Sequence, residues 1–511
     1  MIGGARVRRA VAREVAVDVP AALNLLGAML KYLSAAYLLP IGLAVGYGEP
    51  VWPFVAGGAV AALGGWALEA ATSGKERVKP REGFLVVGLA WLVVPAVGAI
   101  PYLLGDEAKL AEPINAYFES VSGFTATGAT ILDDIEALDR SVAMWRQFTQ
   151  WLGGMGIVIL ALAVLPRLRV GGRQLLQAEL PGPTEIERLS VSIRETARRL
   201  WVLYVALTGM LIALLVAYGW TGLDERMSPY EAVAHAFTTV AIGGFSTQAE
   251  SAAAFGPLVQ WTMLAFIVVA GVNFLRLYRV FVQREPRVVA RDEEFRVYLL
   301  LLLAGATILL LEILAAGRYE GEEAVRHAAF QAVSIMTTAG FASADYVHWG
   351  SLAAMTLLVL MFFGASAGST SGSIKVVRHV LIGRVLRREL DQTVHPELIA
   401  PVRLNHAVVD ERTLRAVVTF VLLYVTLFTL GSLGLVIESF RTQGEVAPFE
   451  AIAAAAATLG NVGPAFGFAG PFGSYDEFSP LSKGIMIGLM WLGRVEIIPV
   501  AVLFTRAYWR S

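Results

Sequence analysis

Four short segments of this chain combine glycine with small and hydroxyl-bearing residues, and each lies between long apolar runs. The first runs from Ser120 to Thr130 and reads SVSGFTATGAT. The residues before it could form only about three helical turns, too short to cross a hydrocarbon core of about 30 Å. A short helix followed by a Gly/Thr-rich strand is typical of a re-entrant pore loop. Its backbone can stay unpaired at membrane depth only where it lines a water- or ion-filled cavity.

The same pattern recurs three times further along the chain. The segments are EAVAHAFTTVAIG (231–243), AAFQAVSIMTTAG (328–340) and AIAAAAATLGNVG (451–463). Internal repetition of this kind indicates an architecture built from equivalent units. Ordinary loops between membrane helices are also rich in glycine, but four at equivalent positions favour a pore built from four repeats.

The chemistry that these segments predict is cation coordination by backbone carbonyls, which can replace the hydration shell of an ion. Each short helix would point its C-terminal, negative dipole end toward the centre. The loop side chains are almost all neutral, so carbonyl dipoles would set the selectivity and favour a large monovalent cation. The predicted ion-binding residues are Thr127, Gly128, Ile242, Gly243, Ala339, Gly340, Val462 and Gly463, with Asn461 as a further potassium contact.

An interruption in the third repeat predicts a gate. The apolar run from Ser351 to Gly364 is followed by ASAGSTSGS (365–373), which is rich in hydroxyls. We expect a broken helix beneath the filter, but glycines spaced by four are also typical of tight helix packing. The predicted gate residues are Gly364, Gly368, Ser369, Thr370, Ser371, Gly372 and Lys375.

The same run contains a formal G-x-S-x-G motif centred on Ser366. As a nucleophile elbow it would indicate an intramembrane serine hydrolase, a different class of function. The elbow needs a preceding strand and a histidine in reach. The run before Ser366 is helical in pattern, and His379 lies several turns away among basic residues. We therefore do not expect an enzyme.

The composition indicates an all-α integral membrane protein. The 511 residues are 56% hydrophobic and only 16% charged, with a mean hydropathy of +0.62. There is no cysteine and the six histidines are scattered, so neither a disulfide framework nor a histidine/cysteine metal motif is expected. Apolar runs predict ten membrane helices, near 21–47, 53–72, 83–104, 148–166, 201–220, 258–282, 297–316, 351–381, 416–437 and 485–507.

These spans divide into an N-terminal helix hairpin and four repeats of helix, pore loop and helix. The predicted boundaries are 1–82 for the hairpin, then 83–175, 176–291, 292–392 and 393–511 for the repeats. The third of these repeats contains the interruption. A secondary transporter with a midplane site is the alternative, but that class predicts inverted repeats. Here each repeat crosses an even number of times and so keeps one orientation.

Lysine and arginine predict the orientation in the membrane. Segments 1–13, 75–81, 167–173, 276–291 and 375–388 are basic, as are Arg506 and Arg510. By the positive-inside rule this side, with both termini, faces the cytoplasm. The pore loops then open outward among acidic residues that attract cations. The basic connections 167–198 and 376–413 would serve either as a partner-docking face or as topology determinants.

The sequence resembles the Trk/Ktr/HKT superfamily of cation transporters, and most closely its TrkH-type potassium uptake subunits. The resemblance rests on SGFTATGAT, TTVAIGGFST, MTTAGF, NVGP, FFGASAGSTSGSIKVVR and WLGRVEIIPVAVLF. It implies one pore per chain, homodimers in the inner cell membrane, and a cytoplasmic nucleotide-binding regulatory subunit of TrkA type. The transported ion would be K⁺ or Na⁺, with no cofactor in this chain and no nucleic-acid partner. Ala126 and Ala339 stand where relatives often carry threonine.

Arg494 and Glu496 lie inside an otherwise apolar span, where a charge is costly and usually functional. They are two residues apart and so do not face each other on a helix. The resemblance matches Arg494 to an arginine near the pore below the filter, where it would act as an electrostatic barrier or hold the gate. A structural ion pair with another helix is the alternative.

Overall fold

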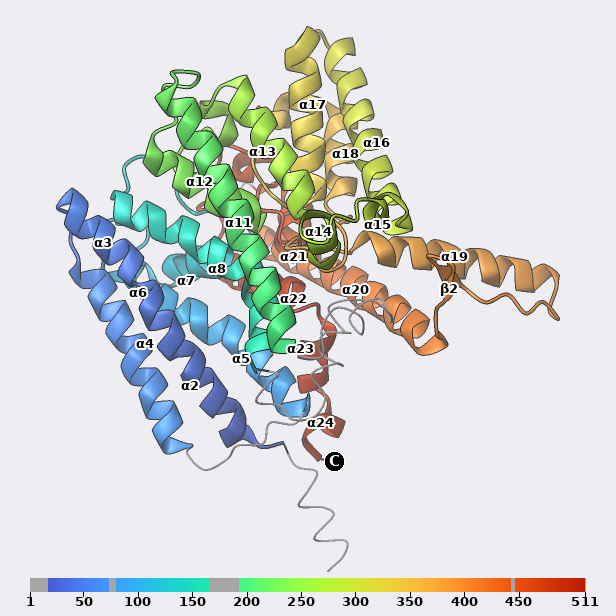
Figure 1. Ribbon diagram of the computed structural model, residues 1–511, viewed down its shortest axis with the longest axis horizontal. Coiled ribbons are helices and arrows are strands. Elements are labelled where there is room, and N and C mark those ends of the chain that lie inside the picture. Colours follow the sequence, from blue (N-terminus) through green and yellow to red (C-terminus); the bar gives the residue numbers. More distant parts are fainter. Residues whose placement is uncertain (1–16, 73–79, 165–192, 443–445, 511) are drawn as a thin grey trace, which may run out of the picture.

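The computed structural model describes residues 17–72, 80–164, 193–442 and 446–510. Almost every regular element among them is a helix, and the strands β1 (Arg403–Leu404) and β2 (Ala407–Val408) form only a two-residue antiparallel ladder. The predicted all-α membrane fold is therefore confirmed (Figure 1). The basic segments 1–13, 75–79 and 167–173, with most of the connection 167–198, lie outside the described residues.

The N-terminal hairpin consists of α2 (Val19–Ala36), α3 (Leu38–Tyr47) and α4 (Trp52–Ala71), at one edge of the molecule (Figure 1). Its helices approach closely because glycines face each other: a Cβ on Gly65 would collide with the Gly27 carbonyl. The buried Tyr37 fixes the hairpin to the first repeat. Its hydroxyl donates to the Val97 carbonyl at 2.8 Å, and its ring stacks on Trp145.

The helices after the hairpin group into four sets, called repeats below, each with a first helix, a short helix (called the pore helix for its predicted role) and a second helix. The first repeat comprises α5 (Pro80–Gly98) with α6 (Ile100–Leu104), α7 (Pro113–Phe124) and α8 (Arg140–Val164). The second comprises α11 (Ile193–Trp220), α12 (Pro229–Ala241), α13 (Pro257–Ala270) and α14 (Phe274–Phe281). The third comprises α16 (Glu293–Ala315), α17 (Gly321–Met336), α18 (Ser351–Leu360) and α19 (Val376–Val394). The fourth comprises α20 (Glu411–Arg441), α21 (Pro448–Leu459), α22 (Pro480–Arg494) and α23 (Ile498–Leu503).

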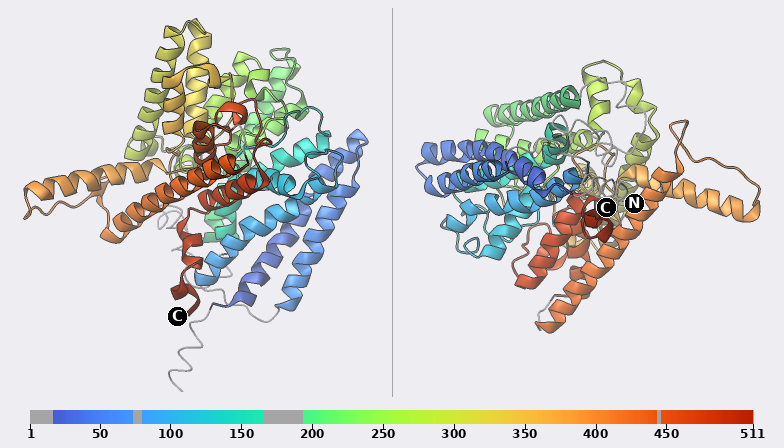
Figure 2. Two further views of the ribbon diagram at one scale, coloured as in Figure 1. Left: turned by 180° about the vertical axis from the view of Figure 1, so that it is seen from behind. Right: turned by 90° about the horizontal axis from the view of Figure 1, so that it is seen from below.

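Short elements complete the described part of the chain: the helices α15 (Arg287–Ala290) and α24 (Arg506–Arg510) and three 3₁₀ turns, η1 (Ser251–Ala254), η2 (Tyr346–His348) and η3 (Gly467–Ala469). The predicted connection 376–413 consists mainly of α19 and the β1–β2 hairpin. Both views of Figure 2 show α19 projecting from the body, on the side opposite the N-terminal hairpin. A small separate core that includes Val377, Leu381 and Leu414 packs its base against α20.

The second helix is broken in three repeats, whereas the sequence predicted a break only in the third. The axis bends by 107° between α13 and α14, where the Asn273 side chain accepts hydrogen bonds from two N–H groups and so starts α14 anew. The break between α22 and α23 contains Glu496 and Ile497 at positive φ. Within the described residues, six helices are long and apolar enough to cross a membrane, or seven with the bent pair, against the ten spans predicted. The difference arises partly because breaks shorten α18 and α22.

Candidate ion pathway

The four pore helices α7, α12, α17 and α21 are buried over most of their length, and three of them begin with a proline. Proline suits the first helical position because its missing N–H would be unpaired there and its φ is preset for a helix. Each of these prolines, Pro113, Pro229 and Pro448, lies 15 residues before a glycine of the following loop. The equivalent segments at the ends of the pore helices are called the pore loops below: 125–130, 241–246 (which includes the last residue of α12), 337–342 and 460–465.

The pore loops share one backbone conformation. Each has a residue at positive φ, then one ordinary residue, then a glycine at positive φ. Positive φ is uncommon outside glycine and is strained for β-branched residues such as Ile242 and Thr338, so its fourfold recurrence makes these loops the candidate functional site. The pairs are Ala126 and Gly128 (50° and 86°), Ile242 and Gly244 (56° and 82°), Thr338 and Gly340 (68° and 76°), and Asn461 and Gly463 (53° and 105°).

This conformation turns the amide of the middle residue back onto its own pore helix. The N–H of Thr127 donates to the Ser122 carbonyl, five residues earlier, at 2.8 Å. The N–H groups of Gly243, Ala339 and Val462 likewise donate to the carbonyls five residues before them, at 2.9, 2.7 and 2.8 Å. The four helix ends therefore hold the four loops in the same way.

The residues predicted for the second repeat, Ile242 and Gly243, are one position too early in the sequence. The structural equivalents of Thr127 and Gly128 are Gly243 and Gly244, not Ile242 and Gly243. The reason is that the repeat contains two adjacent glycines, and the positive φ required of the equivalent glycine falls on the second. The constant spacing from Pro229 was the sequence signal that gives the correct register.

The glycines meet the next repeat in a closed ring. A Cβ on Gly128 would collide with the Gly243 carbonyl oxygen, one on Gly244 with that of Ala339, and one on Gly340 with that of Val462. The ring closes because a Cβ on Gly463 would lie 2.6 Å from the Thr127 carbonyl oxygen. One carbonyl from each repeat therefore lies against the backbone of its neighbour around a common centre.

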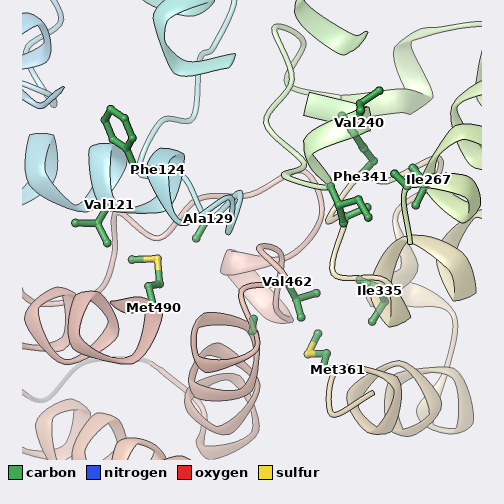
Figure 3. Packing of buried hydrophobic residues seen from close by; sticks show 14 of the residues in the cluster. Val121, Phe124, Ala129, Val240, Ile267, Ile335, Phe341, Met361, Val462 and Met490 are labelled. Atoms are coloured by element: carbon green, nitrogen blue, oxygen red, sulfur yellow. The ribbon is translucent and has the colours of Figure 1, made fainter. Parts of the chain in front are cut away.

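Apolar side chains from all four repeats pack around the pore loops and hold them in place. Figure 3 shows this packing, with every labelled residue nearly inaccessible to solvent. The labelled residues are Val121, Phe124 and Ala129 of the first repeat, Val240 and Ile267 of the second, Ile335, Phe341 and Met361 of the third, and Val462 and Met490 of the fourth.

A polar position behind the pore loops also repeats, and the sequence analysis missed it. Glu119 accepts hydrogen bonds from the Thr130 hydroxyl (2.9 Å) and the Ile131 N–H (3.0 Å). At the equivalent position, His235 bonds the Ser246 hydroxyl at 2.9 Å. In each case a side chain of the pore helix forms a hydrogen bond with the loop that follows that helix.

Glu119 forms a fully buried ion pair with Arg146 of α8 at 2.8 Å. Arg146 also donates to the Ser246 carbonyl at 3.3 Å, which links the first repeat to the second. A buried pair is costly to assemble, but removing one partner is far more costly because it leaves a lone buried charge. The pair thus fixes the outer end of two pore loops. A carboxylate inside a short buried helix was the signal that could have indicated it.

The third-repeat helix ends at Leu360 and resumes at Val376, and residues 361–375 form an intramembrane loop beneath the pore loops. The N–H of Gly372 donates to the Thr338 hydroxyl at 2.7 Å, and a Cβ on Gly372 would collide with the Gly460 carbonyl. The Thr370 hydroxyl donates to the Val240 carbonyl at 3.3 Å. The loop therefore touches the pore-helix ends of repeats two, three and four.

Other contacts hold this loop from below. Asn273 of the α13–α14 bend donates to the Ala367 carbonyl at 2.6 Å, and the Glu294 carboxylate accepts the Ala367 N–H at 2.6 Å. The Lys375 ammonium donates to the Ser371 carbonyl within the loop itself.

Arg494 bridges the intramembrane loop to the first repeat. Its guanidinium donates to the Thr370 carbonyl at 2.9 Å and to the Gly153 carbonyl of α8 at 2.8 Å. Glu496 instead pairs with Arg378 of α19. The charge of Arg494 thus lies among carbonyl oxygens at the level of the loop.

The outer mouth is less acidic than the sequence predicted, because two lysines lie among its carboxylates. Lys109 contacts both Asp133 and Asp476 (2.8 Å to the latter), and the hydrogen bonds to these carboxylates raise its pKa. Lys483 also contacts Asp476, at 3.3 Å. Burial alone would raise the pKa of Asp476, but the two lysines hold it below its usual value. A cavity lined by Gly128, Gly244, Gly340 and Asp133 opens directly above the ring.

Known proteins resemble this chain over most of its length. The family described as "TrkH: Cation transport protein" matches residues 53–511. The chain is 36% identical to "Trk system potassium uptake protein TrkH" of Escherichia coli over 439 residues, 86% of this chain and 88% of that protein. It is also 36% identical to the protein of the same name from Halomonas elongata, covering 96% and 99%. The crystal structure of the potassium transporter TrkH from Vibrio parahaemolyticus superposes with a TM-score of 0.83 at 31% identity, covering 97% of this chain and 100% of that one.

Proposed function

The chain belongs to the TrkH family of cation transport proteins, and we propose that it conducts potassium through a single pore built from its four repeats. It is a multi-pass membrane potassium uptake protein of the Trk system and not an enzyme. The observation that carries the single-pore proposal is the closed ring of glycines and carbonyls, in which each repeat contacts the next in order.

The proposed selectivity filter consists of the carbonyls of Thr127, Gly243, Ala339 and Val462 with their following glycines. Backbone oxygens would replace the hydration shell of the ion, and four helix ends with negative dipoles would stabilise its charge. Asn461 supports this ring indirectly, since its side-chain amide donates to the Thr127 hydroxyl at 3.0 Å. The order of the ring argues against the secondary-transporter alternative, because inverted repeats would not meet head to tail around one centre.

The intramembrane loop 361–375 is the proposed gate, and the residues predicted for it from Gly364 to Lys375 all lie in it. What supports this role is its place beneath the pore helices and the hydrogen bond from its Gly372 N–H to the hydroxyl of Thr338 in the third pore loop. Arg494 would add a second barrier. At an effective dielectric of about 20, a unit charge about 6 Å from a cation opposes its passage by on the order of 3 kcal/mol. Conduction would require the loop and Arg494 to move aside.

Assembly and orientation are part of the same proposal. We place the chain in the inner cell membrane with both termini in the cytoplasm, on the basis of its basic segments. A homodimer with a cytoplasmic nucleotide-binding subunit of TrkA type would follow from family membership. The projecting α19 is the proposed contact for such a partner; its Arg384, Arg387 and Arg388 each pair with a carboxylate, so the contact does not depend on unpaired positive charge.

Ion flux into liposomes tests the filter. Purified wild type and Gly244→Ser are reconstituted, and the uptake of K⁺, Rb⁺ and Na⁺ is compared. Gly209→Ser on α11 is the matched control, because a Cβ there meets nothing within 4 Å. We expect Gly244→Ser to lose discrimination between K⁺ and Na⁺ and Gly209→Ser to keep it. Unchanged selectivity in a well-folded Gly244→Ser protein would rule out the proposed filter.

A further inference from the structure

A crevice of about 530 Å³ opens between α11 and α14, away from the ring and the intramembrane loop. Val202, Ala206 and Met210 form its α11 wall, at the spacing of one helix face, and Phe281 forms part of its α14 wall. These side chains are exposed: Val202 by 63% and Phe281 by 52%. In a membrane protein such an apolar surface faces lipid.

The crevice has the length of one acyl chain. From Arg199 to Met210 the helix rises about 17 Å, close to half of a hydrocarbon core of about 30 Å. It thus spans about one leaflet.

The charge lies at one end only. Arg198 and Arg199 line the end that belongs to the basic side of the protein, and the Arg199 guanidinium lies 5.6 Å from the centre of the Tyr278 ring. Arginines at the membrane surface beside a crevice between helices attract anionic lipid headgroups. We propose that this crevice binds an anionic phospholipid of the cytoplasmic leaflet, with its phosphate at Arg198 and Arg199 and one acyl chain against Val202, Ala206 and Met210.

Such a lipid would act on the intramembrane loop through α14. At the other end of this helix the Phe274 N–H donates to the Gly368 carbonyl at 3.1 Å, and the Phe274 ring packs on Tyr204 of α11. A lipid that holds α11 and α14 together therefore stabilises the loop in the position described. This consequence rests on the proposed gating role of the loop, whereas the binding site does not.

Lipid binding by the full-length protein tests the site. Native mass spectrometry compares phosphatidylglycerol with phosphatidylcholine of the same acyl chains. At about 1 kcal/mol per charge, the two arginines contribute at most about 30-fold of preference for the anionic lipid. We expect Arg198→Gln/Arg199→Gln to abolish that preference and Ala206→Trp to weaken the binding of both lipids. Arg412→Gln/Arg415→Gln, which removes two exposed charges from α20, should bind as wild type does.

Two results would overturn the site. One is equal binding of the two lipids by wild type. The other is an undiminished preference in the Arg198→Gln/Arg199→Gln protein. Rb⁺ flux then tests the coupling separately: wild type should conduct faster in phosphatidylcholine than in phosphatidylglycerol liposomes, and the double variant equally in both. Lipid binding without any difference in flux would refute the coupling to the loop alone.

Discussion

The glycines of the ring are required for two separate physical reasons. Gly244 has a φ of 82°, which L-residues rarely adopt, and its missing Cβ leaves room for the Ala339 carbonyl. The second reason is the stronger, because a neighbouring backbone cannot move aside without shifting its own loop. The same two conditions hold at Gly128, Gly340 and Gly463.

Loss of the Arg494 charge should speed conduction. Arg494→Gln removes a fixed positive charge and its bond to Thr370, and both effects weaken the barrier. A barrier lower by on the order of 3 kcal/mol would raise flux by up to about a hundredfold. Single-channel or liposome flux measures this, with the exposed Arg387→Gln as control, and the ranking of ions should not change. A folded Arg494→Gln protein that conducts no faster would show that the arginine is structural.

The buried pair behind the ring should dominate local stability. Glu119→Gln leaves Arg146 with a lone buried charge, so we expect about 3–5 kcal/mol of destabilisation, together with weakened K⁺ selectivity. Glu320→Gln on the exposed surface should change neither. Thermal unfolding in detergent and flux ratios report the two effects.

The double variant Glu119→Gln/Arg146→Gln sharpens this test, since it removes both charges. Its destabilisation should be smaller than the sum of the two single changes, because neither charge is left alone. Additive losses would mean that the two side chains act independently.

At the scale of elements, the intramembrane loop is the part most easily shortened. Deletion of about six residues within 367–373 removes its contacts with Thr338 and Arg494 but leaves α18, α19 and the ring. Cation flux should rise while the K⁺/Na⁺ ratio is retained. Lower flux or lost selectivity would show that the loop serves helix packing instead, which is the alternative indicated by its glycines spaced by four.

The outer mouth links the first repeat to the fourth through Lys109, Asp133 and Asp476. The pKa of Asp476 is lower in the folded protein than its normal value of 3.8. The ionised carboxylate therefore stabilises the fold fully at pH values above 3.8. That contribution is lost as the pH falls through the lower folded value. Asp476→Asn should therefore lower the unfolding temperature slightly at pH 7, by the equivalent of about 0.2–1 kcal/mol, and the difference should vanish once the pH is below the lowered pKa of the folded state. A difference that persists in acid would contradict the assignment.

The elements differ in how far the sequence could predict them. Long apolar runs and the recurring Gly/Thr segments predicted the hairpin, most spans and the four pore helices, because these signals are local. The bend between α13 and α14 escaped prediction because hydropathy stays high across Gly271 and Val272, and only the capping contacts of Asn273 create it. The pair Glu119–Arg146 escaped because its members are 27 residues apart on separate helices.

At the scale of the whole molecule, the four repeats form one closed set rather than a row of independent hairpins. Each contributes one carbonyl to the ring, and Arg494 and Arg146 carry contacts from one repeat to another. A change in any one repeat should therefore reach the common centre. The register of the second repeat was predicted wrongly because two adjacent glycines compete for one position, although the spacing from Pro229 identifies the second.

Anomalous X-ray scattering from Rb⁺ tests the central claim most directly, because it places the ion without reference to transport rates. Crystals of the protein in Rb⁺ should show a peak on the axis of the ring, with the carbonyl oxygens of Thr127, Gly243, Ala339 and Val462 as its ligands. The peak should disappear in Gly244→Ala. A Rb⁺ ion held by carboxylates, or by residues of a single repeat, would contradict the account, as would a ring that binds none.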